Sequence, residues 1–92
     1  MQIEFDPVKD AANLAKHGVS FSALEGFEWG GCISWQDLRT VYPERRECAI
    51  GYIGNRLYFV VFTDRLNVQY EARRVISLRK ANKREEVFYA NA

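Results

Sequence analysis

The sequence predicts a small α+β domain, in which an N-terminal strand and two short helices precede an antiparallel sheet of about four strands and a C-terminal helix. Apolar residues recur at helical spacing early in the chain and alternate with polar residues later. The pair Gly54-Asn55 stands between two apolar runs, which is typical of a tight β-hairpin. The 92 residues, 48% of them apolar, fit one packed domain that covers residues 1–92.

The first strand and helix have clear boundaries in the sequence. Residues 2–5, "QIEF", alternate as a short strand does. Asp6 can cap the helix that follows, Pro7 suits its first turn, and Gly18 can take the left-handed conformation that ends it. The face of this helix expected to contact the core is formed by Val8, Ala11, Ala12 and Ala15.

A second short helix and then a series of strands follow. Residues 19–27 predict the helix, with Ser22 as a candidate cap and Gly30-Gly31 as the break after it. The candidate strands are residues 32–38, 46–53, 56–63 and 68–77, and the C-terminal helix is residues 80–90. Residues 57–62 are apolar on both faces, as expected of the central strand of a covered sheet.

Several classes of function have little support in the sequence. No apolar run is long enough to span a membrane and no signal peptide is visible, so we expect a cytoplasmic protein without membrane contact. Cys32 and Cys48 lie outside any CxxC or His/Cys cluster, which favours buried free thiols. His17, the single histidine, stands in the last turn of the first helix, where a structural role is favoured over proton transfer. We expect no metal and no cofactor, because ligand clusters and glycine-rich phosphate loops are missing.

The net charge of +1 hides an asymmetry along the chain. Residues 1–64 contain six Lys/Arg and nine Asp/Glu, a net charge of −3. Residues 65–92 contain seven Lys/Arg and three Asp/Glu, a net charge of +4. The split indicates a polyanion or an acidic partner at the C-terminal end, although a solvated helix face has the same composition.

Strand geometry separates the arginines of the basic segment. Arg73 and Arg74 are neighbours on the last strand and must point to opposite faces of the sheet. Alternation places Arg74 on the side of Val68, Tyr70, Ala72 and Ile76. An inward arginine needs an anion or a carboxylate partner, because an unpaired buried charge is costly. Arg73 is expected to face water, as are Lys80 and Arg84.

Five residues are the candidates for catalysis if these charges form a site. They are expected to converge at one end of the sheet: Arg65, Arg74, Arg79, Lys83 and Glu85. Guanidinium groups bind phosphate bidentately and can stabilise a phosphorane-like transition state without a metal. RNA permits such chemistry, since its 2′-hydroxyl attacks the adjacent phosphate once a base takes its proton. Glu85 is the favoured base, with Glu47 and Asp64 as alternatives, and Lys83 is the other candidate for handling the 2′-hydroxyl proton. The competing interpretation is a solvated face with one or two structural ion pairs.

RNA contacts outside the reacting centre have their own candidates. The aromatic residues lie mostly in strand patterns or on a helix face, where core packing is the stronger expectation. Tyr89, one turn beyond Glu85, is the best candidate for stacking on a base. Arg73, Lys80, Arg84 and Tyr89 therefore form the predicted RNA-binding set.

Three motifs of the sequence resemble motifs of the BrnT toxin family, and they occur in the same order along the chain. "FDPVKDAANLAKHGVSF" is similar to the "DP-K---N--KHG--F" opening of that family, and "RRECAIGYIGNRLYFVVFTDR" to its strand hairpin. "RRVISLRKANKREEVFY" resembles the closing "R-IS-R-A---E---Y" pattern. By motif position Arg65, Arg74, Arg79 and Glu85 match recurrent polar positions, whereas Lys83 and Tyr89 match more loosely. Asp64 stands where many members carry Glu.

The resemblance implies a RelE-like ribonuclease toxin of a bacterial type II toxin–antitoxin pair. The toxin would cleave RNA and arrest translation. Its partner would be a BrnA-like antitoxin with a ribbon-helix-helix DNA-binding part, through which the pair would reach operator DNA. The alternative is a non-catalytic module whose basic C-terminal segment docks an acidic protein or nucleic acid.

Overall fold

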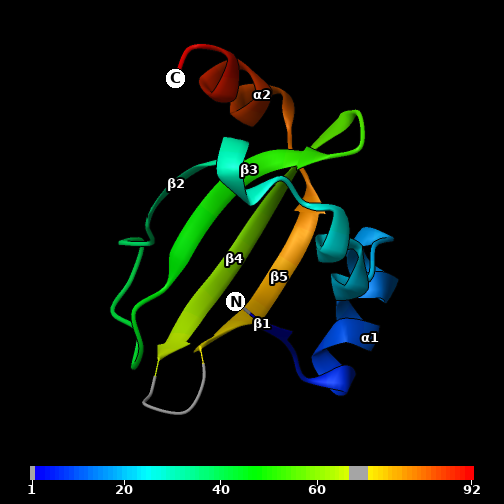
Figure 1. The fold of residues 1–92 in the computed structure, drawn as a ribbon, viewed down its shortest axis with the longest axis vertical. Coiled ribbons are helices and arrows are strands. Elements are labelled where there is room, and N and C mark those ends of the chain that lie inside the picture. The colour runs from blue at the N-terminus through cyan, green and yellow to red at the C-terminus, as the bar shows by residue number, and fades with distance from the viewer. Residues whose placement is uncertain (1, 67–70) are drawn as a thin grey trace.

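The computed structural model describes residues 2–66 and 71–92 and has the expected α+β class. Val68 and Tyr70, predicted to begin the last strand, lie outside the described residues. The elements are β1 (Gln2–Glu4), α1 (Pro7–His17), the 3₁₀ helices η1 (Phe21–Gly26) and η2 (Trp29–Gly31), β2 (Ile33–Gln36), β3 (Glu47–Ile53), β4 (Arg56–Leu66), β5 (Glu71–Lys80) and α2 (Lys83–Ala90). Figure 1 shows α1 beside β5, and α2 at one end of the sheet.

Over the described residues the sheet has five strands in the order β1-β5-β4-β3-β2 and is mixed. Strands β2 to β5 form the expected antiparallel meander, but β1 adds to the edge of β5 in parallel. The prediction of a wholly antiparallel sheet of about four strands is therefore incomplete. A three-residue alternating run carries no information about the direction of its partner, which only the rest of the fold decides.

The central hairpin forms where the sequence predicts it. Gly54 has a φ of 61° and lies between β3 and β4, which fits a type II′ turn with Gly at its first central position. Strand β4 lies between β3 and β5, and its side chains are buried on both faces as expected, Phe59 and Val61 on one face and Val60 and Phe62 on the other. The register between β4 and β5 shifts at Val61/Phe62, which lets Val75 and Leu78 both be buried although they are three residues apart.

The predicted core face of α1 is wrong, although its ends are correct. Asp6 accepts a hydrogen bond from the Val8 N–H, and Gly18 ends the helix at a φ of 75°. Yet Val8 is 77% exposed, and Ala11, Ala12 and Ala15 are exposed as well. The helix instead attaches through Asn13, whose side chain donates to the C=O groups of Leu78 and Val19 and accepts from the Leu78 N–H.

The segment after α1 forms a 3₁₀ helix, and its cap is Ser20 rather than Ser22. The Ser20 hydroxyl accepts from the Ser22 N–H, and the Asp10 carboxylate accepts from the Ser20 hydroxyl and from the Phe21 N–H. These contacts fix the turn that inserts Phe21 and Leu24, both buried, against the sheet.

The two faces of the sheet differ in what covers them. The helix-covered face packs Phe21, Leu24 and Phe27 against Val60, Phe62, Val75 and Leu78. The open face carries Cys48, Ile50, Phe59 and Val61, with Tyr89 of α2 packed against one end of it. In the part of the chain that the structure describes, no helix is long and apolar enough to cross a membrane.

Candidate functional site

Arg73 and Arg74 lie on opposite faces of the sheet, as strand geometry requires. On β4 the partner of Arg73 is Asp64 and the partner of Arg74 is Thr63. Arg73 does not face water: its guanidinium lies 4.3 Å from the centre of the Phe62 ring and 4.4 Å from that of Trp29, and it binds Asp64 through two hydrogen bonds of 2.7 and 3.0 Å. The expectation of an exposed Arg73 is wrong because aromatic rings of the helix-covered face extend over it.

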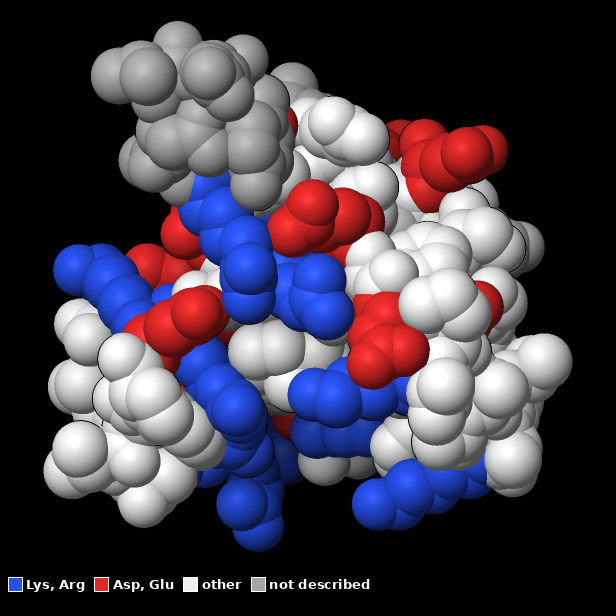
Figure 2. All heavy atoms as spheres, turned by 90° about the horizontal axis from the view of Figure 1, so that it is seen from below, with Lys and Arg blue, Asp and Glu red and all other residues white. Residues whose placement is uncertain are grey.

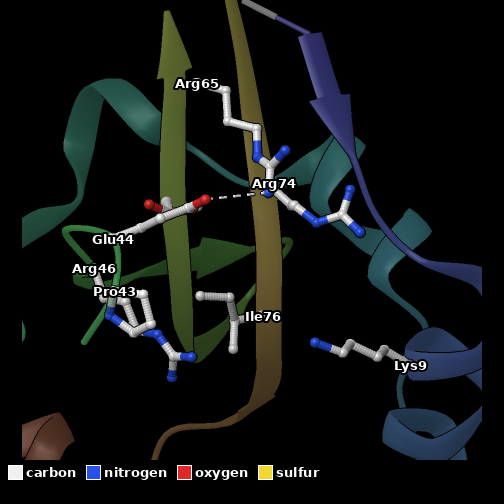
Figure 3. Close-up of a pocket in the computed structure, with 8 residues that line it drawn as sticks. Lys9, Pro43, Glu44, Arg46, Arg65, Arg74 and Ile76 are labelled. Carbon is white, nitrogen blue, oxygen red and sulfur yellow. Dashed lines mark ion pairs between the residues drawn. The ribbon is translucent and has the colours of Figure 1, made fainter.

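Arg74 belongs to a cluster of cations at one end of the open face. Together with Arg65, Arg46 and Lys9 it lines a hollow of about 190 Å³. We call this hollow the basic pocket; its remaining lining residues are Pro43, Glu44, Thr63 and Ile76. Figure 3 shows Lys9 extending toward it from α1 and Arg46 from the segment before β3. Seen from this end of the molecule, Lys and Arg side chains gather closely, with carboxylates between them (Figure 2).

The ion pairs inside the basic pocket are loose. Arg65 and Arg74 share Glu4, with N–O distances of 3.7 and 3.8 Å, and Arg65 lies 3.5 Å from Glu44. The guanidinium side chains are 42% and 33% exposed. Such distances exceed those of good charge-assisted hydrogen bonds, so the nitrogen atoms have donors left for another anion.

The loop between β2 and β3 is ordered around Asp37 and brings Arg46 and Glu44 to the pocket. The Asp37 carboxylate, only 1% exposed, accepts three hydrogen bonds from Arg39 and one from the Tyr42 hydroxyl. The Arg39 hydrogen bonds hold the pKa of Asp37 well below its usual range, even though burial opposes ionisation. The Asp37 N–H donates to the Arg46 C=O, which closes the loop.

Arg79 and Glu85 do not meet Arg65 and Arg74, so the predicted convergence of all five residues is wrong. Arg79 is the partner of Phe59 on β4, six residues before Arg65, which is about 20 Å along a strand. Arg79 binds Glu85 through two hydrogen bonds of 2.8 Å and lies 4.5 Å over the Phe59 ring. The open face therefore has a basic end and an end that is held by a tight ion pair.

Glu85 is occupied by structural contacts. Its carboxylate accepts from the Asn82 N–H while the Asn82 side chain accepts from the Glu85 N–H, a capping box that begins α2. Burial raises the pKa of Glu85, but the hydrogen bonds from Arg79 and from the Asn82 backbone outweigh it, and the net shift is downward. A carboxylate stabilised in this way is a poor proton acceptor.

The other predicted residues lie near α2 or on the helix-covered side. Lys83 and Arg84 are exposed in the first turn of α2, and Lys80 is exposed at the end of β5. Tyr89 donates its hydroxyl to the Gly31 C=O and packs edge-on against Tyr52, so its ring holds α2 in place.

Both alternative bases point away from the basic pocket. Asp64 is bound to Arg73, and Glu47 pairs with Arg45 from a position opposite Phe62. Both cysteines are free thiols, Cys48 buried and Cys32 half-buried. In residues 2–66 and 71–92, no group of three or more His, Cys, Asp or Glu side chains is arranged to hold a metal ion.

Sequence reasoning missed four residues of this region, namely Lys9, Arg46, Glu4 and Glu44. Lys9 had a signal, because it is the lysine of the "DP-K" opening motif. The other three depend on contacts between distant segments, since Glu4 is next to Arg74 only through the parallel β1–β5 pairing.

Comparisons with known proteins identify the family of the chain. A family profile described as "Ribonuclease toxin, BrnT, of type II toxin-antitoxin system" matches residues 5–85. An OVARIAN TUMOR DOMAIN-containing deubiquitinating enzyme 1 of Arabidopsis thaliana is 38% identical over 56 residues, 61% of this chain. That stretch covers 17% of the plant protein's length. Since the profile covers most of the chain, the protein belongs to the BrnT family, ribonuclease toxins of type II toxin–antitoxin systems.

Proposed function

We propose that the protein is an endoribonuclease whose reacting phosphate binds in the basic pocket. The observation that carries this proposal is the position of Arg65 and Arg74, which extend from the open face beside Arg46 and Lys9 and have only loose carboxylate contacts. Among the residues that the structure describes, four cations line the pocket, and Glu4 and Glu44 are the carboxylates within reach of its arginines. A phosphodiester can displace such carboxylates, because guanidinium binds phosphate through two parallel hydrogen bonds.

The proposed reaction is attack of the 2′-hydroxyl oxygen on the adjacent phosphorus without a metal. Glu44, which lines the pocket, takes the 2′-hydroxyl proton as the new P–O bond forms. Arg65 and Arg74 stabilise the charge that develops on the phosphate oxygens. The bond from phosphorus to the 5′-oxygen then breaks, and the leaving oxygen takes a proton from the Lys9 ammonium. The products are a 2′,3′-cyclic phosphate and a 5′-hydroxyl.

This assignment revises the residue roles expected from the sequence. Arg65 and Arg74 keep their proposed roles, whereas the contacts of Arg79 and Glu85 favour a structural one. We propose that Lys80, Lys83 and Arg84, exposed near the other end, contact RNA only outside the cleavage centre.

The biological setting is part of the same proposal. We infer a RelE-like toxin that cleaves RNA in the cytoplasm and arrests translation, and that is neutralised by a BrnA-like antitoxin. That antitoxin would supply the ribbon-helix-helix part, and operator DNA would be bound only through it. The family membership supports a toxin with an antitoxin partner, and the basic pocket supports a polyanionic substrate.

The test is cleavage of single-stranded RNA by the purified protein in the presence of a chelator. Arg74→Ala should slow cleavage by about 10²- to 10³-fold, and Arg74→Lys should recover only part of the rate because bidentate contact is lost. Lys16→Ala, which removes an exposed charge at the far end of α1, should cleave at the wild-type rate. Full activity of Arg74→Ala would mean that Arg74 has no part in the mechanism. If the wild-type protein stopped cleaving RNA in the presence of the chelator, metal independence would be contradicted.

Two observations distinguish the proposed ribonuclease from the alternative, a module that binds RNA without cutting it. A toxin should stop growth when its expression is induced, and the product of a neighbouring gene should relieve the arrest. A folded wild-type protein that binds RNA, leaves it intact and is harmless when expressed would favour the module.

A further inference from the structure

A second hollow lies on the open face, between the basic pocket and α2. Its volume is about 510 Å³, within the range of small-molecule sites. Its lining consists of Trp35, Gln36, Asp37, Leu38, Arg39, Cys48, Phe59, Arg79 and Glu85. We call it the aromatic hollow, because rings and planar groups form its walls. The proposed reaction uses none of these residues.

The walls of the aromatic hollow present flat surfaces. Phe59 is 7% exposed and lies beneath the Arg79 guanidinium, whose own side chain is 33% exposed. Trp35 stands edge-on to Phe59 at 5.9 Å between ring centres, and to Phe88 at 5.6 Å. Trp35 keeps 37% of its surface exposed although two rings hold it in place. Aromatic rings and guanidinium planes of this kind stack on unpaired bases.

Polar groups at the margin can bind the edge of a planar ligand. The Arg39 side chain lines the hollow and is 65% exposed, so its guanidinium nitrogens can donate to the edge of a base. Gln36 is the partner of Glu47 on β3, and strand alternation places its side chain on the other face of the sheet from Trp35. The Glu85 carboxylate, 15% exposed, already accepts hydrogen bonds from Arg79 and from the Asn82 N–H. Asp37 already receives four hydrogen bonds and is less available.

The aromatic hollow continues into the basic pocket along two strands. On β4, Phe59 lines the first and Thr63 the second, with Val61 as the one residue between them that faces the same side. Cys48 lines the first and Arg46, two residues earlier, lines the second. Phe59 and Thr63 are four residues apart, about 13 Å, so both sites can contact one short stretch of a single RNA strand.

We propose that the aromatic hollow binds an unpaired nucleobase of the RNA whose phosphate lies in the basic pocket. The base stacks on Trp35 and on the outer plane of the Arg79 guanidinium, and its edge lies near Arg39. This inference rests on the proposed function, since RNA is the ligand. It adds a requirement for single-stranded RNA and places base recognition outside the cleavage centre. An acidic or apolar protein segment would not explain two flat surfaces next to a phosphate site.

The test measures binding without cleavage. A short single-stranded 2′-O-methyl oligonucleotide lacks the attacking hydroxyl, and an abasic oligonucleotide with the same number of phosphates lacks the bases. Wild-type protein should bind the first more tightly by about 5- to 150-fold, the range of one stacked base. Trp35→Ala should remove this preference, and Arg74→Ala should lower the affinity for both oligonucleotides by the same factor. Val87→Ala, a truncation of a 52% exposed apolar residue outside the hollow, should keep the wild-type preference.

A second measurement does not require Trp35→Ala to fold. The chain has two tryptophans, and Trp29 packs against Phe62 and Arg73 on the other side of the sheet. Fluorescence quenching by the 2′-O-methyl oligonucleotide should occur in the wild type and be lost in Trp35→Phe.

Three results would overturn the proposal. They are equal wild-type affinity for both oligonucleotides, unchanged preference in Trp35→Ala, and quenching of Trp35 by the antitoxin but by neither oligonucleotide. The last result would assign the hollow to the protein partner. Failure of cleavage with unmodified RNA, together with a retained base preference, would instead contradict the proposed reaction and leave this inference standing.

Discussion

Arg73 and Arg74 are adjacent in the sequence and nearly opposite in their surroundings. Arg73 lies on the helix-covered face, pressed on two aromatic rings and bound to Asp64 at 2.7 Å. Arg74 lies on the open face, and Glu4 is its carboxylate at 3.8 Å. A charged residue is therefore available for ligands when its intramolecular contacts are loose, whatever its position in a basic segment.

The same contrast recurs along the open face. Arg79 has two 2.8 Å hydrogen bonds to Glu85, whereas Arg65 has ion pairs of 3.5 and 3.7 Å. Tight pairs connect elements, here β5 to α2, and loose pairs surround the basic pocket. Loss of a tight pair should therefore lower the stability of the fold, and loss of a loosely paired arginine should lower RNA affinity.

The largest expected change in stability comes from the attachment of α1. Asn13→Ala should lower the free energy of unfolding by about 2–3 kcal/mol, because the buried N–H and C=O of Leu78 lose their partner. Leu14→Ala on the same helix should cost less than about 1 kcal/mol, since Leu14 is 50% exposed. Chemical denaturation of the two variants measures the difference. Similar losses would mean that apolar contacts hold α1.

This helix shows what the sequence determines and what it leaves open. Asp6, Pro7 and Gly18 mark its ends correctly, because capping depends on residues within a few positions. Apolar spacing failed to identify the buried side, which carries Asn13 and, at its margin, Asp10. The deciding partner of Asn13 is Leu78, 65 residues away, and no local pattern contains that information.

The two neighbouring arginines give the next prediction. Arg73→Ala should destabilise the fold by about 1–2 kcal/mol, since it removes ring stacking and a bidentate ion pair, and should leave RNA affinity nearly unchanged. Arg74→Ala should have the reverse effect, with stability within about 0.5 kcal/mol of the wild type. Thermal unfolding and RNA binding, measured on both variants, form the test. A loss of RNA affinity in Arg73→Ala would restore Arg73 to the RNA-binding set.

The ion pair at the start of α2 predicts a dependence of stability on pH. The pKa of Glu85 is lowered in the folded protein, so its contribution is present above the unfolded pKa, about 4.3, and is lost as the pH falls through the folded value. Glu85→Gln should cost about 1 kcal/mol at pH 7 and progressively less below pH 4. Denaturant midpoints from pH 3 to pH 7 measure this, with Glu25→Gln, at an exposed residue of η1, as the control. Parallel curves for wild type and Glu85→Gln would contradict the assignment.

Only part of the candidate site could be predicted from the sequence, because contacts between distant segments decide the rest. Alternation within one strand correctly put Arg74 on the face opposite Arg73. Grouping Arg79 with Arg65 required the register between β4 and β5, where Arg79 pairs with Phe59 near the start of β4. A compact run of charge in the sequence became two separate regions, because an extended strand separates its residues by about 3.3 Å each.

The smallest expected effect distinguishes the two RNA contacts of the open face. A phosphate contact releases counterions, so the dependence of log affinity on log salt should weaken by about 0.7 in Arg74→Ala. Stacking on Trp35 releases none, and Trp35→Ala should weaken binding without changing the slope. The measurement is a salt titration of the 2′-O-methyl oligonucleotide against both variants. An unchanged slope in Arg74→Ala would mean that no phosphate of the RNA binds in the basic pocket. A reduced slope in Trp35→Ala would mean that the aromatic hollow acts through charge, so that its rings are not where the base binds.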